Sequence, residues 1–319
     1  SLRKQELLTF VIIGAGLAGA AMAASLARRG WQVTVLDAAD RPAAGASGVP
    51  AAVFAPHVSP DDALLSRLTR AGLRLTWQQL HDRLEEGVDW RASGVIERRA
   101  PGDDRLPPDW SAEGANESWR ADAARLQSVG LPDQTTALWH AFGGWAKPAH
   151  LVAAWLTQPG VTVRCGARVA RIEARAASAG WQLFDGEDRL LVEADRVVIA
   201  AGFESAALAP QAILQPVRGQ VAWGRMAVAP NLPTTPLNGD GHLIAHVPDA
   251  DGAFWLAGWL AGRPQPPGWL TASLLAGPGR RRGAADAALV GLAALAELAD
   301  GEARVGHNIV LGDQVASAL

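Results

Sequence analysis

The hydrophobic and polar positions near the amino terminus change their period twice within thirty residues. Residues 9–16, "TFVIIGAG", form an apolar run that ends in glycines, which is typical of a strand buried in a parallel sheet. Residues 17–30, "LAGAAMAASLARRG", are mostly small and apolar and predict a helix that Gly30 ends. Residues 31–37, "WQVTVLD", predict the next strand, with Asp37 at its carboxyl end. The pattern is strand, tight turn, helix and strand.

Two other interpretations of this stretch are a secretory signal and a membrane span. Arg3 and Lys4 precede the apolar run, as they would in a signal peptide. A membrane span needs roughly twenty apolar residues, whereas glycines interrupt this run and Arg28 and Arg29 follow it. A nucleotide-binding unit accounts for every part of the stretch. It is therefore favoured, and no membrane partner is expected.

The glycines have the spacing of a dinucleotide-binding turn. Gly14 permits the tight turn, Gly16 lets the backbone approach a pyrophosphate, and Gly19 lets the helix pack closely on the strand. The amino terminus of the helix then offers free N–H groups to the phosphates. An acid 23 positions after the first glycine is placed to accept hydrogen bonds from a ribose. The expected cofactor contacts are Gly14, Ala15, Gly16, Leu17, Ala18, Gly19 and Asp37.

Residues 41–56, "RPAAGASGVPAAVFAP", predict a loop of small residues. Gly45, Ala46 and Ser47 would allow the backbone to wrap closely around a flavin or a pyrophosphate. An ordinary alanine-rich surface loop explains the same composition equally well. The loop alone does not decide between the two.

Later segments favour FAD over a nicotinamide cofactor. Residues 161–184 predict two strands flanking "ASAG", and residues 190–202 predict one buried strand that ends on small residues. Such a strand suits a sheet whose carboxyl edge covers a long cofactor. A second glycine-rich fingerprint, expected of a nicotinamide-linked reductase, is missing. Further cofactor contacts are expected at Arg168, Val169, Ala201 and Gly202.

Composition limits the function classes. The 319 residues are 49% hydrophobic, enough for one large core or two smaller ones. With 29 basic and 32 acidic residues the net charge is -3, so no bulk field attracts nucleic acid or anionic lipid. The single cysteine, Cys165, excludes an internal disulfide, suggests no metal site and fits the reducing cytoplasm. It is expected within a strand, badly placed for a flavin thioether, so FAD should bind non-covalently.

Several segments resemble the D-amino-acid-oxidase superfamily of flavoproteins. Within it, the chain is most similar to the FAD-dependent domain of bifunctional enzymes that modify the wobble uridine of tRNA. The resemblance covers most of residues 9–260 and fades beyond, and residues 59–75 carry its most specific part. The segments are "GASG" at 45–48, "SPDDALLSRLTRAGLRL" at 59–75, "GGWAKPAHLVAAWL" at 143–156, "DRVVIAAG" at 195–202 and "QPVRGQVAW" at 215–223.

The resemblance implies a flavin amine oxidation. A secondary amine bearing a carboxymethyl group would be oxidised, with release of glyoxylate and a primary amine. The substrate would be tRNA or a small N-alkyl glycine, and a methyltransferase partner domain would lie outside this chain. A glycine, D-amino-acid or sarcosine oxidase and a flavin-binding protein without turnover are the alternatives.

The expected fold class is α/β, with a Rossmann-like FAD-binding domain and an antiparallel-sheet substrate domain. The FAD-binding domain is expected to be discontinuous, from 9–80, 145–215 and 286–319, with a helix at 286–300. The substrate domain is expected from 85–142 and 216–262, with strands in 219–228, 241–247 and 253–262.

Candidate catalytic residues each have a plainer interpretation. Arg218 could hold the substrate carboxylate or pair with a carboxylate at a strand end. His57 and Lys147 lie in segments that the family places near the flavin, and each also fits an ordinary loop residue. The remaining basic candidates, for tRNA phosphate or for a solvated surface, are Arg67, Arg70 and Arg74 at helical spacing and the run Arg280, Arg281 and Arg282.

The carboxyl-terminal segment "RVGHNIVLGDQVASAL" departs from the family pattern. Relatives carry a strand of the type "VGVRCATRDHLP" followed by a turn "GHGSRG". Aligned on Val305 and Asp313, the expected arginines fall on Asn308 and Gly312, and the turn has no counterpart. We expect that the chain lacks part of the complete protein. The alternative is a flavin-binding relative with impaired turnover.

Overall fold

The computed structural model describes residues 8–110, 112–175, 179–212, 214, 216–260 and 304–311. It divides the chain into two compact units. The first takes its described residues from 8–49, 148–216 and 309–311, and the second from 50–147, 217–260 and 304–308. Among the described residues, no helix is both long and apolar enough to cross a membrane.

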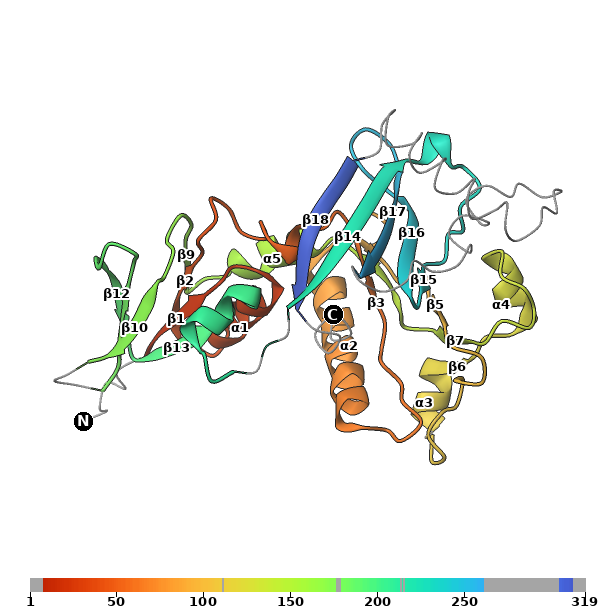
Figure 1. Ribbon diagram of the computed structural model, residues 1–319, viewed down its shortest axis with the longest axis horizontal. Coiled ribbons are helices and arrows are strands. Elements are labelled where there is room, and N and C mark those ends of the chain that lie inside the picture. The colour runs from red at the N-terminus through yellow and green to blue at the C-terminus, as the bar shows by residue number, and fades with distance from the viewer. Residues whose placement is uncertain are drawn as a thin grey trace. The chain divides into compact units, whose positions relative to one another are not determined.

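The first unit is built on a parallel sheet of strand order β13-β1-β2-β9, as the opening pattern predicts. Figure 1 shows α1 lying across this sheet. The elements of the unit are β1 (Thr9–Ile13), α1 (Leu17–Ala27), β2 (Gln32–Leu36), η1 (Ala46–Gly48), α5 (Pro148–Leu156), β9 (Val161–Arg164), β10 (Arg171–Ala174), β11 (Trp181–Phe184), β12 (Leu190–Ala194), β13 (Arg196–Ile199), η2 (Gly202–Glu204) and α6 (Ser205–Leu208).

The strands of an antiparallel sheet, β10-β11-β12, lie along the chain between β9 and β13 of the parallel sheet. The two strands flanking "ASAG" are confirmed as β10 and β11. The single strand expected at 190–202 is wrong, because β12 pairs with β11 while β13 pairs with β1. Asp195 separates them: its carboxylate accepts hydrogen bonds from the N–H and the hydroxyl of Thr9, each at 2.8 Å. The hydrogen bonds between Asp195 and Thr9 of β1 thus mark the point where one apolar run leaves the antiparallel sheet and enters the parallel one.

The second unit contains nearly all of an eight-stranded sheet, of order β18-β14-β17-β16-β15-β5-β7-β6, and a three-stranded sheet, β3-β8-β4. Strands expected from the sequence are confirmed as β14, β16 and β17, which pair antiparallel. The elements are β3 (Ala52–Phe54), α2 (Leu64–Arg83), β4 (Trp90–Arg91), β5 (Val95–Arg98), α3 (Ala112–Glu117), β6 (Ser118–Arg120), α4 (Ala123–Ser128), β7 (Ala137–His140), β8 (Gly144–Ala146), β14 (Pro216–Arg225), η3 (Met226–Val228), β15 (Leu237–Asn238), β16 (Gly241–Val247), β17 (Phe254–Leu260) and β18 (Arg304–Leu311).

Residues 50–80 belong by their contacts to the second unit, whereas we expected them in the FAD-binding domain. The reason is local pairing. β3 pairs with β8, and the guanidinium of Arg99 donates to the carbonyl of Val58 at 2.9 Å. Arg74 of α2 forms an ion pair with Glu117. The predicted helix at 286–300 lies outside the described residues.

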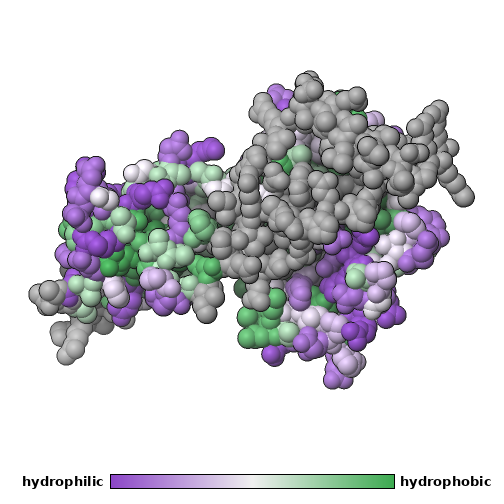
Figure 2. Space-filling model, in the orientation of Figure 1, coloured by the Kyte–Doolittle hydropathy of each residue, from purple (hydrophilic) through white to green (hydrophobic). Residues whose placement is uncertain are grey.

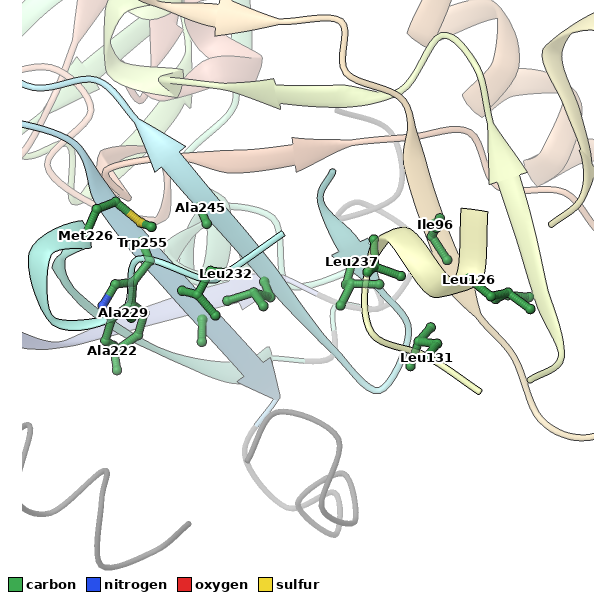
Figure 3. Close-up of a cluster of buried hydrophobic side chains, with 14 residues drawn as sticks. Ile96, Leu126, Leu131, Ala222, Met226, Ala229, Leu232, Leu237, Ala245 and Trp255 are labelled. Atoms are coloured by element: carbon green, nitrogen blue, oxygen red, sulfur yellow. The ribbon is translucent and has the colours of Figure 1, made fainter. Parts of the chain in front are cut away.

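Each unit has its own apolar core. In the first, Val11, Ile13 and Leu36 of the parallel strands meet Leu183 of β11. In the second, a cluster of fourteen buried residues extends along the large sheet from η3, with Met226, to α4, with Leu126 (Figure 3). Trp255 and Leu126 in this cluster are at most 1% exposed.

The surface of α2 is not uniformly polar. Leu64, Leu68 and Leu75 are 62%, 60% and 64% exposed. Figure 2 shows hydrophobic atoms, in green, over the region of this helix. The helix therefore combines an exposed apolar stripe with the arginines of its other faces.

A buried polar network joins three neighbouring strands of the second unit. Ser118 of β6 and His140 of β7 are fully buried, and the Ser118 hydroxyl lies 2.8 Å from His140 Nδ1. His140 Nε2 lies 2.8 Å from the carboxylate of Glu97 on β5, which also accepts from Arg99 at 3.0 Å. Burial alone would raise the pKa of Glu97, but the bonds from His140 and Arg99 outweigh it and lower that pKa to about 2. Glu97 is therefore ionised at neutral pH and binds both His140 and Arg99.

We predict that Glu97→Gln lowers the free energy of unfolding by about 3–5 kcal/mol at neutral pH, because it leaves the Arg99 guanidinium buried without a countercharge. Chemical denaturation measures this change. In the wild type, the depressed pKa means that this stability is fully present above the unfolded pKa of 4.5 and is lost as pH falls from 4.5 towards 2.

Glu204→Gln is the matched control, since its ion pair with Arg168 joins side chains that are 54% and 64% exposed. Removing this exposed pair should change stability by about 0–1 kcal/mol. Equal losses in both variants, or an unchanged acid dependence in Glu97→Gln, would contradict the assignment.

Candidate cofactor-binding site

The glycine turn of the first unit depends on backbone approaches that no side chain permits. Gly14 has a φ of +108°, and a Cβ placed on it would lie 2.3 Å from the carbonyl oxygen of Ala200. A Cβ on Gly19 would lie 1.8 Å from the carbonyl oxygen of Gly14. The first contact brings the 200–202 segment beside the turn, and the second seats α1 against it.

The amino terminus of α1 is arranged to receive an anion. The first N–H groups of a helix lack intrahelical acceptors, and that of Leu17 donates instead to the Ser47 hydroxyl oxygen at 3.0 Å. The Ser47 hydroxyl keeps its own hydrogen for a further acceptor. Gly16 lies at the same point, where a Cβ would be 3.0 Å from Ser47 Oγ. Ala18 is exposed. Gly16, Ser47 and the helix end are therefore the groups that would face a phosphate bound here.

Asp37 follows β2 and is fixed by two backbone donors. One carboxylate oxygen accepts from Ala15 N at 2.6 Å and the other from Ala39 N at 2.8 Å. A carboxylate has about four acceptor positions, so each oxygen can accept one bond more. The side chain is therefore held beside the glycine turn and remains able to bind ribose hydroxyls.

The other predicted cofactor contacts lie in different surroundings. Gly45 and Ala46 are exposed residues preceding Ser47, and Ala201 and Gly202 form the segment that approaches Gly14. Val169 is buried in the core of the unit, which leaves only its backbone for a ligand.

Arg168 forms an exposed ion pair with Glu204 at 2.8 Å. This pair lies on the surface. Among the described residues, no hydrogen bond or ion pair links the Arg168 side chain to the glycine turn. Its role in cofactor binding stays a prediction.

Cys165 lies one residue after β9, whereas we expected it within the strand. Burial, with the nearby charges of Asp37 and Asp40, raises the pKa of its thiol. The thiol is therefore neutral at physiological pH and a poor nucleophile. This state agrees with the expected non-covalent attachment of FAD.

Two candidates, Arg218 and Asn308, are described by their backbone alone. Arg218 lies on β14 and Asn308 on β18. The arginine run at 280–282 lies outside the described residues. Lys147 is half-buried and directly precedes α5.

The second unit carries a groove of about 530 Å³ between α2 and the segment around Trp110. Arg67, Arg70 and Arg74 all line it, as their helical spacing predicts for one face. The Arg70 guanidinium lies 5.0 Å from the centre of the Trp110 ring and forms an ion pair with Asp62 at 2.7 Å. Sequence reasoning missed Trp110, because nothing in its local pattern indicates that it faces α2.

The buried Glu97, His140 and Ser118 were also missed. They come from three strands, and only the sheet register brings them together. Among the described residues, no group of three or more histidine, cysteine, aspartate or glutamate side chains is arranged to hold a metal ion.

Comparison with known proteins agrees with this geometry. Residues 9–308 match the family described as FAD dependent oxidoreductase. The chain is 51% identical over 258 residues to the tRNA 5-methylaminomethyl-2-thiouridine biosynthesis bifunctional protein MnmC of Paracidovorax citrulli, covering 78% of the chain and 41% of that relative. The MnmC protein of Verminephrobacter eiseniae is 49% identical over 263 residues, covering 79% and 42%. The chain thus spans about two fifths of the length of these relatives.

Solved structures agree in fold. Glycine oxidase from Bacillus cereus superposes with a TM-score of 0.65 at 17% identity, covering 96% of this chain and 84% of that one. Glycine oxidase from Geobacillus kaustophilus gives a TM-score of 0.60 at 20% identity, covering 95% and 83%. At such identities the likeness concerns the fold alone, and it confirms the expected α/β fold class.

The residues of the first unit fit FAD. The α1 amino terminus and the Ser47 hydroxyl would donate to a pyrophosphate, Gly16 would let the backbone approach it, and Asp37 would accept from a ribose. These groups come from one compact unit, so they are in place without a ligand.

We predict that Gly16→Ala weakens FAD binding on the order of tenfold to a hundredfold. The added methyl group would disturb a charge-assisted contact of about 1.5–3 kcal/mol between the backbone and the phosphate. Titration of the apoprotein with FAD, followed by flavin fluorescence, measures the dissociation constant. The backbone of Gly16 has a φ of -83°, so alanine introduces no backbone strain.

Gly186→Ala is the control, because a Cβ there meets no atom within 4 Å. Unchanged FAD affinity in Gly16→Ala would rule out this turn as the pyrophosphate site. So would an equal loss of affinity in both variants.

Proposed function

Because the chain belongs to the FAD dependent oxidoreductase family and uses FAD as its cofactor, we propose that it oxidises the C–N bond of a carboxymethylaminomethyl group on the wobble uridine of tRNA. Glyoxylate and a primary amine are the proposed products. The identity of 51% to a relative named for tRNA 5-methylaminomethyl-2-thiouridine biosynthesis carries this proposal.

The proposed chemistry removes two electrons from the substrate amine. Bound FAD supplies the acceptor for a hydride. Loss of hydride from the carboxymethyl carbon and of a proton from nitrogen leaves an imine, to which water adds. The C–N bond then breaks to give the primary amine and glyoxylate. The first unit holds the cofactor through Ser47, Asp37 and the α1 amino terminus.

The groove beside α2 is lined by three arginines and by Asp61, Asp62 and Asp109, so it is the exposed Arg67 that supports a nucleic acid as the proposed substrate. Arg67 is exposed, and Arg70 and Trp110 form a stacked cation and ring beside it. Arginines that face the phosphate backbone supply most of the sequence-independent affinity for nucleic acid. The net charge of -3 makes such a local patch necessary.

The relatives are described as bifunctional, and the chain spans only part of them. Their name specifies a methylaminomethyl group, whereas the proposed product carries an aminomethyl group. The difference is one methyl group, so we propose a methyltransferase domain as the partner that consumes this product. Since tRNA is modified in the cytoplasm, we place the reaction there.

Anaerobic addition of carboxymethylaminomethyl-modified tRNA to the purified holoprotein should bleach the visible absorbance of the oxidised flavin, and glyoxylate should form in equal amount. The flavin spectrum and a chemical trap for glyoxylate measure both. Unmodified tRNA is the control and should leave the flavin oxidised. Bleaching by glycine or sarcosine but not by the modified tRNA would instead identify a small-molecule amine oxidase.

Arg67→Ala should weaken tRNA binding and reduce the slope of log K against log salt by about one, because one phosphate contact is lost. Binding titrations at several salt concentrations measure the slope. Arg196→Ala, which removes an exposed arginine outside the groove, is the control. If both variants have the wild-type slope, the groove does not contact tRNA.

A further inference from the structure

The described side chains that line the groove beside α2 carry balanced charges. They include three arginines and three aspartates, namely Arg67, Arg70, Arg74, Asp61, Asp62 and Asp109. Balanced charges give a phosphate no field that draws it into the groove. The volume of about 530 Å³ is nonetheless that of a small-ligand site, which is typically about 300–1,000 Å³. The groove therefore suits an uncharged polar group better than a phosphate.

Arg70 already has its charge satisfied within the groove. Its Nη1 lies 2.7 Å from Oδ1 of Asp62, and the Arg70 side chain is only 15% exposed. The guanidinium carbon lies over the Trp110 ring, 5.0 Å from its centre. A guanidinium that is paired with a carboxylate has little net charge left for a phosphate, but it remains a planar group on which a ring can stack. Arg70 is therefore suited to stacking rather than to ion pairing with a ligand.

The Trp110 ring that supports Arg70 is itself fixed. Its Nε1 donates a hydrogen bond to the carbonyl oxygen of Ser118 at 3.0 Å, and Ser118 is fully buried. Gly114 lies so close to the ring that a Cβ on it would be 2.6 Å from the indole. Because the indole cannot move without losing these contacts, the guanidinium rests on a rigid support.

Asp62 holds the same guanidinium from another direction. Its φ of +46° lies in the left-handed region, which few residues other than glycine adopt. The N–H of Asp62 donates to the carbonyl oxygen of Ser59 at 3.1 Å, and this bond closes a turn just before α2. Such conformations persist where the surrounding structure fixes them, and they are frequent at ligand sites. The Asp62 carboxylate and the Trp110 ring thus fix Arg70 before any ligand binds.

An unpaired nucleobase has the chemistry that this groove fits. A base is planar and uncharged, and proteins bind the unstacked bases of RNA loops on aromatic rings or on guanidinium planes. The amino and imino groups at its edge are donors, which the carboxylates of Asp61 and Asp109 can accept. Arg67 is exposed on α2, three positions from Arg70, where it can contact a phosphate of the same strand. The aspartates that disfavour a phosphate inside the groove therefore favour a base there.

We propose that the groove takes one unpaired base of the tRNA, stacked on the Arg70 guanidinium, while Arg67 contacts a neighbouring phosphate. The identity of the nucleic acid rests on the proposed function. The wobble uridine lies in the anticodon loop, whose bases are unpaired, so the proposed substrate carries bases that are free to enter the groove. The contact is one of binding alone, and no covalent bond forms or breaks in it.

Arg70→Lys tests the stacking, because lysine keeps a positive charge beside Asp62 but removes the planar guanidinium. The holoprotein is titrated with carboxymethylaminomethyl-modified tRNA at several salt concentrations. Binding should weaken about fivefold to a hundredfold, with the wild-type slope of log K against log salt, because no phosphate contact is lost. A phosphate contact at this position would survive the exchange for lysine. Wild-type affinity in Arg70→Lys would therefore overturn the proposal.

Arg74→Lys is the matched control on the same helix, since Arg74 pairs with Glu117 and a lysine ammonium can keep that ion pair. Its affinity for the tRNA should equal that of the wild type. Trp110→Leu, which removes the ring that supports the guanidinium, should weaken binding as Arg70→Lys does. Chemical denaturation verifies that each variant is folded. Equal losses of affinity in Arg70→Lys and Arg74→Lys would also overturn the proposal.

A set of tRNAs, each lacking one of its unpaired bases, identifies the base without a change in the protein. One of them should bind the wild type about fivefold to a hundredfold more weakly than the intact tRNA does. The same tRNA should bind Arg70→Lys as well as the intact tRNA does, because both changes remove one shared contact. If every tRNA of the set loses affinity by the same factor with both proteins, no base stacks on Arg70.

The flavin spectrum, recorded in the same titrations, separates this proposal from the proposed function. Binding that depends on Arg70, by a modified tRNA that leaves the wild-type flavin oxidised, would overturn the proposed reaction and support the stacked base. Flavin reduction by this tRNA with wild-type affinity in Arg70→Lys would support the reaction and overturn the stacked base.

Discussion

The close backbone approach at the first turn is the constraint on which the nucleotide-binding unit depends. A side chain on Gly14 would collide with the Ala200 carbonyl, and one on Gly19 would collide with the turn itself. These contacts hold β1, the start of α1 and the end of β13 together at the carboxyl edge of the sheet. The helix amino terminus, Ser47 and the Asp37 carboxylate therefore converge before any ligand arrives, and binding requires little ordering of the protein.

The second unit is organised around a buried charge. Glu97 is bonded to both His140 and Arg99, and Arg99 in turn holds the carbonyl that follows His57. A charge inside a protein is tolerated only when its partners satisfy it. The network therefore fixes the neighbouring segment as firmly as an apolar core would.

For the proposed reaction, the two units carry different candidate binding groups. The first would bind the cofactor through backbone donors, the Ser47 hydroxyl and the Asp37 carboxylate, none of which needs to contact the substrate. The second offers a groove with the exposed Arg67, which is suited to a phosphate backbone.

The sequence by itself determined the elements of short range. The glycine spacing, the run of β1 and the alternation of 241–247 predicted a strand, a turn, a helix and β16, because each depends on neighbours within a few residues. The tertiary structure alone decided the rest. Asp195 divides one apolar run because Thr9 lies opposite it, and Glu97, Ser118 and His140 meet only through the register of three strands. Local preference fixes a strand or a helix, but a hydrogen bond between distant residues depends on which elements the chain packs together.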